Sequence, residues 1–386
     1  MFVKRFLLLI FFLSIVSIQN FSFAEESNEK AIKSNRIDNY EILSISQPGS
    51  LFYSVTNGII KSAINLNSNL TFIGRANVGL EKVIDKNNIE ILTTRKDYLY
   101  SLSIKTIHND VSDLFYSKEV SESLINNEII ISDLTANLYS LTKGDSMFLI
   151  GLNQQEVEVV VGEIIPDSEI GWFEGVVNKD LGYKLGINRN IQAIIWGNKI
   201  TENHLIEIHK NIKYKKIRLT GRDSTPNRNW VLPTALVKEM FGDFQIKERD
   251  GTWITIDRAW KDENIETKNV PILGRITCHR LMWEPLLGAF NQIIEENLQS
   301  GLSREQFKEA GGCYAPRRIN RFDSGGSISR HAWGIAIDIN TKTGYKPRIV
   351  EIFNDWGFAW GGTWTSPDAM HFELRSLSAS ISQANK

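Results

Sequence analysis

Two histidines and two aspartates near the end of the chain have types and spacing that suit a hydrolytic metal site. Asp338 follows His331 by seven residues, and His371 follows Asp368 by three. Catalytic zinc typically takes three protein ligands from His, Asp or Glu and leaves its fourth position to water. A carboxylate that does not bind the metal can then accept the proton of that water. The four residues therefore provide a complete set of groups for metal-assisted hydrolysis.

The backbone around these residues must bring them together. If residues 335–338 form a strand, Ala336 and Asp338 face the same side, and the small alanine leaves space there. Gly334 lets the backbone turn or approach closely, and His371 must then come from a neighbouring strand. A lone histidine on an apolar strand is usually a hydrogen-bonded structural residue, and a lone aspartate after a strand is usually a cap. The combined pattern favours a metal site.

A longer pattern carries a family resemblance. Ser329-x-His331-x-x-Gly334-x-Ala336-x-Asp338, followed by Asp368-x-x-His371-Phe372-Glu373, resembles the signature of the M15 zinc peptidases. These are D-alanyl-D-alanine carboxypeptidases, D-Ala-D-Ala dipeptidases and L-alanyl-D-glutamate endolysins, which share a fold with the hedgehog signalling domain. Upstream, residues 311–319 resemble the segment with the family's active-site arginine, and residues 357–364 resemble its glycine- and tryptophan-rich strand.

The resemblance implies a role for each matching residue. One zinc ion per chain would be bound by His331, Asp338 and His371. Asp368 would be the general base, at a position where many relatives have glutamate. Arg317 would bind the polarised carbonyl oxygen of the scissile bond. Arg318 is the alternative, because only one of two adjacent side chains points inward on an extended segment.

Three nearby residues have more than one interpretation each. Ser329 could orient a ligand, contact substrate or cap a local turn. Trp364 could line the substrate cleft or belong to the core, as aromatic side chains in strands often do. Glu373 could hydrogen-bond a metal-bound histidine or be exposed.

The resemblance also implies the function. We expect an exported zinc metallopeptidase that hydrolyses peptidoglycan stem peptides at a bond to a D-amino acid, with D-alanyl-D-alanine carboxypeptidase activity favoured. An L-Ala-D-Glu type endopeptidase is the first alternative. The second is a non-catalytic domain that binds cell wall or a partner protein. Asp368 argues against this second alternative, because a non-catalytic relative does not need a general base.

The N-terminus has the pattern of a secretory signal. Lys4 and Arg5 precede an apolar run at residues 6–18, and Ala24 ends a small-residue cleavage pattern. We predict cleavage after Ala24 and export to the periplasm, the cell wall or the medium. An uncleaved anchor is the alternative, but the run is shorter than the ~20 residues that a spanning helix needs. No later segment has the length and apolarity of a membrane span.

Export gives meaning to the cysteine count. The chain has only Cys278 and Cys313. In an oxidising compartment such a pair can form a disulfide, but a sequence does not show whether two cysteines are close. Two buried free thiols are the alternative.

Composition sets the number of domains and the class of ligand. The chain has 386 residues, of which 42% are hydrophobic, and this leaves room for two globular domains. The net charge of −1, without a long basic run, argues against nucleic acid as a partner. We predict a flexible lead-in at residues 25–38, a β-rich accessory domain at 39–215, a linker at 216–228 and the zinc peptidase domain at 229–380. The accessory domain has no motif that identifies its partner.

Hydrophobic periodicity predicts an α+β fold, in which the peptidase domain has helices and an antiparallel sheet. Runs of β-branched and aromatic residues predict strands in the accessory domain at residues 52–56, 157–161 and 191–196. In the peptidase domain we expect helices at residues 281–298, from 303 onward and at 347–356, with strands at 333–338 and 371–374.

Overall fold

The computed structural model describes the chain from Leu43 to Leu377 with gaps. The described residues are 43–46, 50–171, 173–197, 202–212, 218–220, 231–249, 252–310, 312–319, 326–340, 342, 346–364 and 367–377. The predicted signal segment and the lead-in at residues 25–38 lie outside these ranges. Within them, no helix has both the length and the apolarity needed to cross a bilayer.

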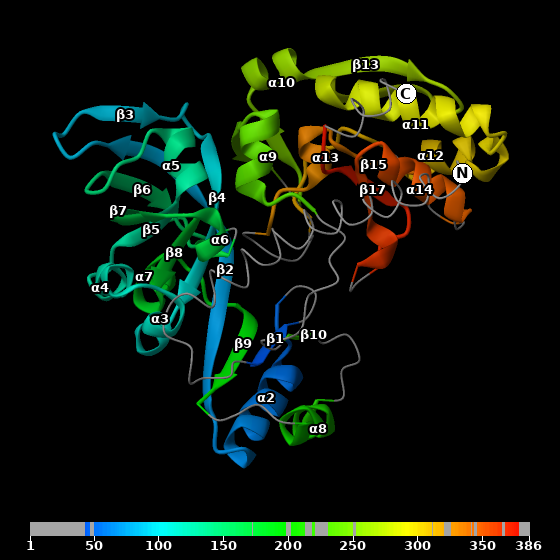
Figure 1. The fold of residues 1–386 in the computed structure, drawn as a ribbon. Helices are drawn as coiled ribbons and strands as arrows, with labels where there is room; N and C mark the ends of the chain where they lie inside the picture. The colour runs from blue at the N-terminus through cyan, green and yellow to red at the C-terminus, as the bar shows by residue number, and fades with distance from the viewer. Residues whose placement is uncertain are drawn as a thin grey trace, which may run out of the picture.

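Six strands of the N-terminal part close into a barrel (Figure 1). They are hydrogen-bonded in the order β2-β6-β7-β5-β8-β4, and β4 pairs back onto β2. Alternate side chains such as Val78, Leu80 and Leu102 are buried in its interior. The strands are β2 (Asn69–Ile84), β4 (Leu99–Ile107), β5 (Ile129–Ser132), β6 (Ser146–Ile150), β7 (Glu156–Ile165) and β8 (Gly175–Asn178). The predicted strand at residues 157–161 is confirmed within β7.

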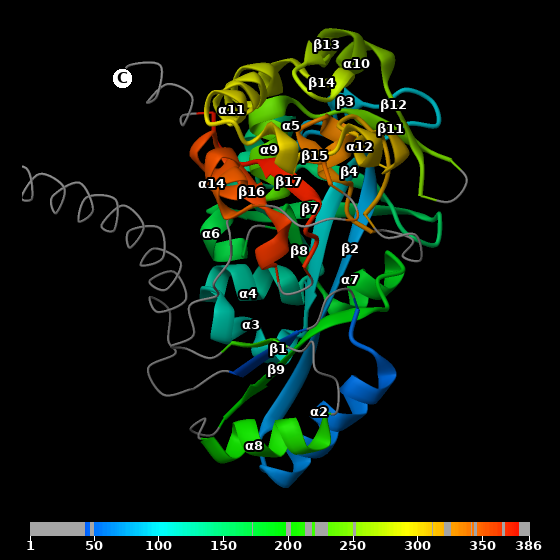
Figure 2. The same cartoon turned by 90° about the vertical axis from the view of Figure 1, so that its right-hand side faces the viewer.

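The barrel continues into a smaller sheet because β2 is long enough to serve both. The start of β2 pairs with β9 (Asn190–Trp196), which confirms the predicted strand at residues 191–196. Two further strands follow, β1 (Leu43–Ser46) and β10 (Arg218–Thr220). Figures 1 and 2 show β2 running from this sheet, beside α2 and α8, into the barrel. The hairpin strand β3 (Glu90–Thr93) pairs with the far end of β2.

The strand predicted at residues 52–56 is wrong, because this segment begins the helix α2 (Tyr53–Asn65). Val55, Ile59 and Ala63 recur every four residues and are buried against the small sheet, together with Ile208 at α8 (Glu202–Asn211). The helical face therefore extends well past the β-branched and aromatic run that suggested a strand. Burial of this face overrides local β-propensity.

Short helices cover the outer face and the ends of the barrel. A small apolar cluster under two of them includes Val111, Val120 and Leu124. The helices are α3 (Asn109–Phe115), α4 (Lys118–Ile125), α5 (Asp133–Tyr139), α6 (Asp167–Ile170) and α7 (Lys179–Lys184). The accessory region thus contains helices as well as strands.

The C-terminal part has its own core of helices packed on a three-stranded antiparallel sheet in the order β15-β17-β16. Phe353 of α14 stacks on Phe372 of β17 with ring centroids 4.3 Å apart. The helices predicted at 281–298, from 303 and at 347–356, and the strand at 371–374, are confirmed. The elements are α9 (Thr234–Phe241), β11 (Gln245–Glu248), β12 (Ile254–Ile256), α10 (Arg258–Asn264), β13 (Ile265–Val270), β14 (Gly274–His279), η1 (Arg280–Met282), α11 (Trp283–Glu295), η2 (Gln299–Gly301), α12 (Arg304–Ala310), α13 (Arg330–Trp333), β15 (Ala336–Asp338), α14 (Pro347–Asp355), β16 (Phe358–Trp360), η3 (Gly361–Thr363) and β17 (His371–Leu374).

The strand predicted at residues 333–338 is correct only for its last three residues. Trp333 belongs to the helical turn α13, and Gly334 ends that turn with a φ of +69°. A side chain at Gly334 would also meet the backbone nitrogen of His279 at 2.7 Å. The glycine therefore separates a helical turn from a strand, a change of conformation that apolar periodicity did not reveal.

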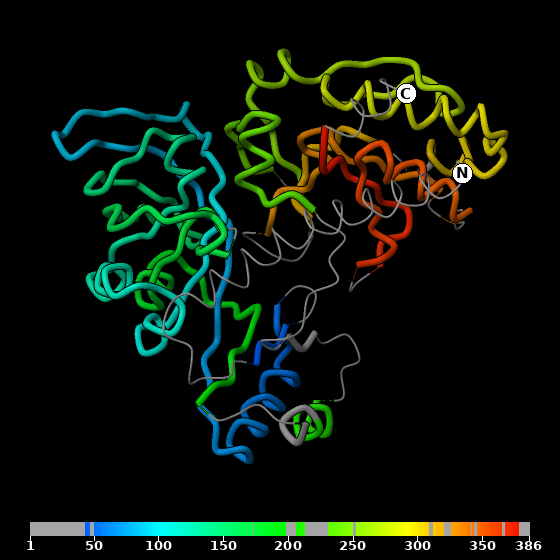
Figure 3. Tube along the Cα trace, in the orientation of Figure 1, coloured from blue at the N-terminus to red at the C-terminus, as the bar shows by residue number. Residues whose placement is uncertain are grey.

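Hydrogen-bonded strands connect the two parts of the chain. On the barrel side, β11 pairs with β4, and β12 pairs with β11. On the other side of β12, Trp253 forms a bridge with Arg317, and Arg318 forms one with Ile328. Figure 3 shows the chain path across this junction. Residues 218–220 of the predicted linker form β10, and the remaining domain boundaries stay predictions.

A buried ionic cluster lies at the same junction. Lys238 of α9 is 1% exposed, and its Nζ lies 2.7 Å from Glu174 Oε1 and 3.3 Å from Asp243 Oδ2. The same Nζ donates to the Tyr139 hydroxyl at 3.0 Å and to the Ser101 carbonyl at 2.6 Å. Glu174, Tyr139 and Ser101 belong to the barrel region. Breaking such a buried pair leaves an uncompensated charge, so the two parts are held in one arrangement.

Candidate metal centre

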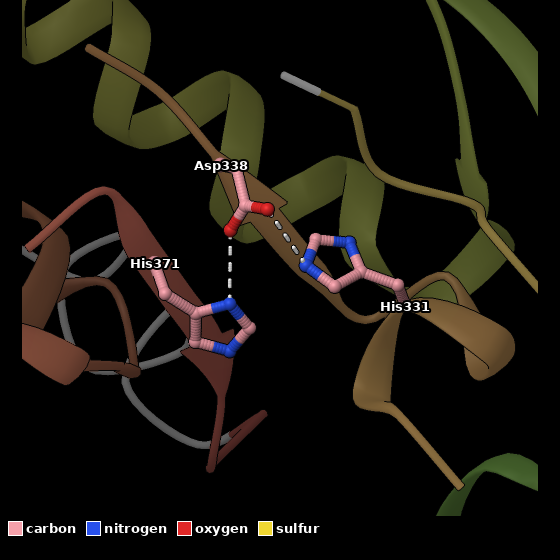
Figure 4. Close-up of side chains that lie close together, drawn as sticks. All are labelled: His331, Asp338 and His371. Carbon is pink, nitrogen blue, oxygen red and sulfur yellow. Dashed lines mark hydrogen bonds and ion pairs between the residues drawn. The ribbon is translucent and has the colours of Figure 1, made fainter. Parts of the chain in front are cut away.

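The antiparallel sheet places two of the predicted ligands opposite each other. Asp338 at the end of β15 is paired in register with His371 at the start of β17. His331 comes from α13, the helical turn just before β15. Figure 4 shows the Asp338 carboxylate between the two imidazole rings. The expectation that His371 comes from a neighbouring strand is thereby confirmed.

The three side chains lie close enough to share one ion. Asp338 Oδ1 lies 2.9 Å from His371 Nδ1, and Asp338 Oδ2 lies 3.3 Å from His331 Nε2. One ligand atom from each residue can be chosen so that all lie within 4.8 Å of one another. All three residues are buried.

The orientation of His331 is fixed by the backbone around it. Its Nδ1 donates to the Cys313 carbonyl at 2.9 Å, so the other ring nitrogen faces Asp338. Ser329 Oγ caps the helical turn by accepting from the backbone nitrogen of His331 at 3.3 Å. The His331 Nε2 is buried, and among the described residues it forms the 3.3 Å ion-pair contact with Asp338 but no hydrogen bond. An orphaned buried nitrogen of this kind fits a metal ligand.

His371 is oriented by a carboxylate on its own strand. Its Nε2 donates to Glu373 Oε2 at 3.2 Å, which leaves Nδ1 on the side of Asp338. Glu373 is 4% exposed, and its other oxygen lies 3.9 Å from Arg330 Nε. Of the two interpretations of Glu373, the hydrogen bond to a ligand histidine holds. A carboxylate in this position fixes the ring and makes the imidazole a stronger ligand.

Electrostatic interactions in the cluster favour an ionised Asp338 and a protonated His371, whose proton a metal cation can replace. Burial would raise the pKa of Asp338, but contacts with His331 and His371 outweigh it and hold that pKa well below the usual range. Burial would lower the pKa of His371, but hydrogen bonds to Asp338 and Glu373 raise it to about 9. The carboxylate is thus ionised and the imidazole binds a proton, which a metal ion held by His331, Asp338 and His371 would have to displace.

The donor set fits a zinc ion. Two imidazole nitrogens and one carboxylate are typical protein ligands of catalytic zinc, and three such ligands leave a coordination position open. Each histidine turns one nitrogen toward Asp338, and each uses its other nitrogen for a hydrogen bond to a carbonyl or carboxylate. This arrangement of supported histidines is the one that metal sites use.

Asp368 lies at the turn that leads into β17. Its backbone nitrogen donates to the Gly361 carbonyl at 2.9 Å, and its carbonyl accepts from the backbone nitrogen of His371 at 3.2 Å. A Cβ placed on Gly361 would stand 3.3 Å from the Cβ atoms of both Asp368 and His371. The Cβ atoms of Asp368 and His371 therefore lie close together around this glycine. Asp368 itself does not belong to the cluster of three candidate ligands.

The two adjacent arginines have different surroundings. Arg318 forms an ion pair with Glu248, and its Nη1 donates to the Gly326 carbonyl at 2.5 Å. The one side-chain hydrogen bond described for Arg317 is a long one of 3.5 Å, from Nη1 to the Arg318 carbonyl. Because the Arg318 guanidinium is bound to Glu248, Arg317 is the better candidate of the two for contact with substrate.

The two predicted substrate-binding residues lie beside the ligands. The ring of Trp364 is 5.2 Å from the ring of His371, and its Nε1 is buried without a hydrogen-bonding partner in the described part of the chain. Ser329 is 4% exposed, and its hydroxyl is used in the cap. The substrate roles of both residues remain predictions.

A disulfide joins Cys278 and Cys313, whose Cα atoms are 5.3 Å apart. Of the two alternatives for the cysteines, a disulfide or two buried free thiols, the structure has the disulfide. Sequence reasoning missed that the Cys313 carbonyl supports His331, and that Arg330, whose side chain is 13% exposed, lies beside Glu373. The position of Arg330 next to a candidate ligand was visible, but nothing in the sequence indicated that its side chain is largely covered.

Comparison with known families bears on this same segment. Residues 323–374 match a peptidase M15 family model whose description is D-alanyl-D-alanine carboxypeptidase. Over these residues the chain is similar to the M15 peptidases. The M15 match contains the three clustered ligands and Asp368, and it leaves Arg317 and the whole barrel outside. No curated protein matches the chain. The match to this family model indicates a peptidase.

Proposed function

We propose that the chain is a zinc-dependent D-alanyl-D-alanine carboxypeptidase that acts on peptidoglycan stem peptides. The observation that carries the proposal is the convergence of His331, Asp338 and His371, each of which offers a ligand atom within 4.8 Å of the others, inside the segment that matches the M15 family model. Zinc in this position supplies Lewis-acid chemistry, because it activates water and polarises the scissile carbonyl.

The protein groups divide the remaining work. Asp368 accepts the proton of the attacking water and later delivers it to the leaving amine. Arg317 donates to the oxygen of the scissile carbonyl, where negative charge develops in the transition state. Glu373 and the Cys313 carbonyl hold the two histidines in fixed orientations. Trp364 bounds the site next to His371.

Export is part of the proposal. The first 24 residues have the signal pattern, and the Cys278–Cys313 disulfide is of a kind that persists in oxidising compartments. We therefore place the mature protein in the periplasm or at the cell wall, where its substrate is found.

Mass spectrometry of purified muropeptides tests the reaction. The mature protein is incubated with muropeptides with and without a chelator, beside an Asp368→Ala variant. Asp110→Ala is a matched control, because this aspartate is 80% exposed on α3, outside the M15 segment. We expect chelator-sensitive loss of a terminal D-alanine that is absent in Asp368→Ala and retained in Asp110→Ala.

Two other outcomes would change the proposal. Cleavage within the stem peptide would assign the protein to the L-Ala-D-Glu type endopeptidases. Unchanged muropeptides in the presence of bound zinc would contradict a peptidase role on this substrate and would favour a cell-wall-binding domain.

A further inference from the structure

One short segment supports two of the three candidate ligands. The Cys313 carbonyl accepts from His331 Nδ1 at 2.9 Å. The neighbouring Gly312 carbonyl accepts from the backbone nitrogen of Asp338 at 3.2 Å, and these two residues form an antiparallel bridge. Ala315 completes the set, because its backbone nitrogen donates to the His331 carbonyl at 2.8 Å. Any shift of residues 312–315 therefore moves both ligands.

The same segment is anchored to β14. Cys313 is joined to Cys278 by the disulfide, and the backbone nitrogen of Tyr314 donates to the Thr277 carbonyl at 2.9 Å. Both cysteines are almost fully buried, at 0% and 2% exposure, in the main C-terminal core. Of these two anchors, the disulfide is the covalent one, and it acts at the residue whose carbonyl holds His331.

We propose that the Cys278–Cys313 disulfide is a positioning element of the metal centre, so that zinc affinity depends on its redox state. This rests on the proposed zinc site. Two unbonded sulfur atoms stand at van der Waals separation, which is larger than a covalent bond, so two thiols need more room than a disulfide. The core around them is closely packed, and reduction therefore displaces residues 312–315 relative to β14.

The displacement acts on metal binding through hydrogen bonds. When the Cys313 carbonyl moves, His331 loses the acceptor that sets its ring orientation. Loss of such a supporting partner typically lowers metal affinity by roughly 10- to 100-fold. In a reducing cytosol the cysteines remain thiols, so the chain has a weak centre before export and a strong one after oxidation. Formation of the disulfide thus confines tight zinc binding to the oxidising compartment that the protein reaches after export.

Zinc affinity of the full mature chain tests the inference without substrate. The zinc dissociation constant is measured by competition with a chromophoric chelator for the oxidised protein, for the phosphine-reduced protein and for a Cys278→Ala/Cys313→Ala variant. Ile293→Ala on α11 is the control for lost stability, because Ile293 is fully buried in the same core but lies on a different element from residues 312–315 and from the three candidate ligands. The d–d spectrum of the cobalt-loaded forms reports ligand geometry directly.

We expect the reduced protein to bind zinc at least about 10-fold more weakly and to show an altered cobalt spectrum. The Cys278→Ala/Cys313→Ala variant needs no extra room in the core, so it should stay closer to the oxidised protein in both measurements. Ile293→Ala should melt at a lower temperature and keep the affinity of the oxidised protein. The rate of zinc release after reduction of the wild-type protein should rise, and this measurement does not depend on whether the double variant folds.

Two results overturn the inference in distinguishable ways. Equal zinc affinities and equal cobalt spectra in the oxidised and reduced forms, with only a lower melting temperature, would make the disulfide a stabilising cross-link and leave the zinc site intact. Absence of zinc binding by the oxidised protein would contradict the proposed function itself, and the inference with it.

Discussion

Asp338 and His371 are partners in strand register, and Asp338 Oδ1 lies 2.9 Å from His371 Nδ1. The pairing of β15 with β17 thus places a carboxylate and an imidazole face to face without help from a loop. Side chains on strands are positioned more precisely than side chains on loops. The remaining ligand, His331, is held by the Cys313 carbonyl.

Removal of the central carboxylate should abolish tight metal binding. Asp338→Asn keeps the size of the side chain but removes the charge that contacts both histidines, so zinc affinity should fall by about 100-fold or more, beyond the range typical for outer partners. Metal content after dialysis, measured by plasma mass spectrometry, checks this. His108→Ala, at a half-exposed histidine in the N-terminal part, should keep full zinc content. Full zinc in Asp338→Asn would show that the metal lies elsewhere.

Asp368 should be needed for turnover but not for zinc binding. Asp368→Asn removes the proton acceptor but leaves the three clustered ligands in place. Loss of a general base typically lowers kcat by about 10²- to 10⁴-fold. Steady-state hydrolysis of a D-Ala-D-Ala peptide and a parallel zinc assay separate the two properties. Wild-type turnover in this variant would assign the proton transfer to another group.

Substitution of each of the two adjacent arginines should cause a different kind of defect. Arg317→Ala should lower kcat by about 10²- to 10³-fold without changing zinc affinity, as expected for loss of a donor to the developing oxyanion. Arg318→Ala removes an ion pair with the half-exposed Glu248 and a hydrogen bond to the Gly326 carbonyl, so it should lower stability but keep near-normal turnover. The opposite pattern would assign the catalytic role to Arg318.

His279 should make the protein less stable in mild acid. It is fully buried, its Nδ1 accepts from the backbone nitrogen of Leu281, and burial lowers its pKa to about 4. The unfolded chain binds this proton with an ordinary pKa of about 6.5, so stability is complete above pH 6.5 and falls as the pH drops toward 4. Between pH 7.5 and pH 5 the free energy of unfolding should fall by about 2 kcal/mol from this residue.

Denaturant unfolding at the two pH values measures this loss. His279→Gln is the matched variant, because an amide can both donate and accept a hydrogen bond but does not titrate in this range. Between the same two pH values, the free energy of unfolding of the variant should fall by about 2 kcal/mol less than that of the wild-type protein. An equal loss in both proteins would assign the acid sensitivity to other groups.

The candidate ligands could be predicted from the sequence because the family pattern fixes each residue relative to its neighbours. The pattern singled out His331, Asp338 and His371, and the structure brings these three side chains together; their role as metal ligands stays a prediction. The supporting groups were harder to find. The Cys313 carbonyl is a backbone group that any residue provides, so no side-chain pattern indicates it.

The failures in secondary structure have local causes. Residues 52–56 carry β-branched and aromatic side chains, but the buried positions of α2 lie four residues apart and extend to Ala63. A five-residue window is too short to show a period of 3.6 residues. At Trp333, apolar alternation across Gly334 suggested a continuous strand, whereas the left-handed glycine ends a helical turn there.

The ladder from β4 through β11 and β12 to Arg317 means that the barrel and the peptidase share backbone bonds as well as side-chain contacts. A protease that cut the chain between Thr220 and Val231 would therefore nick the protein without releasing the enzyme. The two fragments would migrate together until a denaturant separated them. The C-terminal fragment produced alone would expose the edge of β11 and leave Asp243 as the ionic partner of Lys238 after the loss of Glu174, and both changes favour aggregation or misfolding. The barrel and the C-terminal part are therefore expected to be stable only when they remain together.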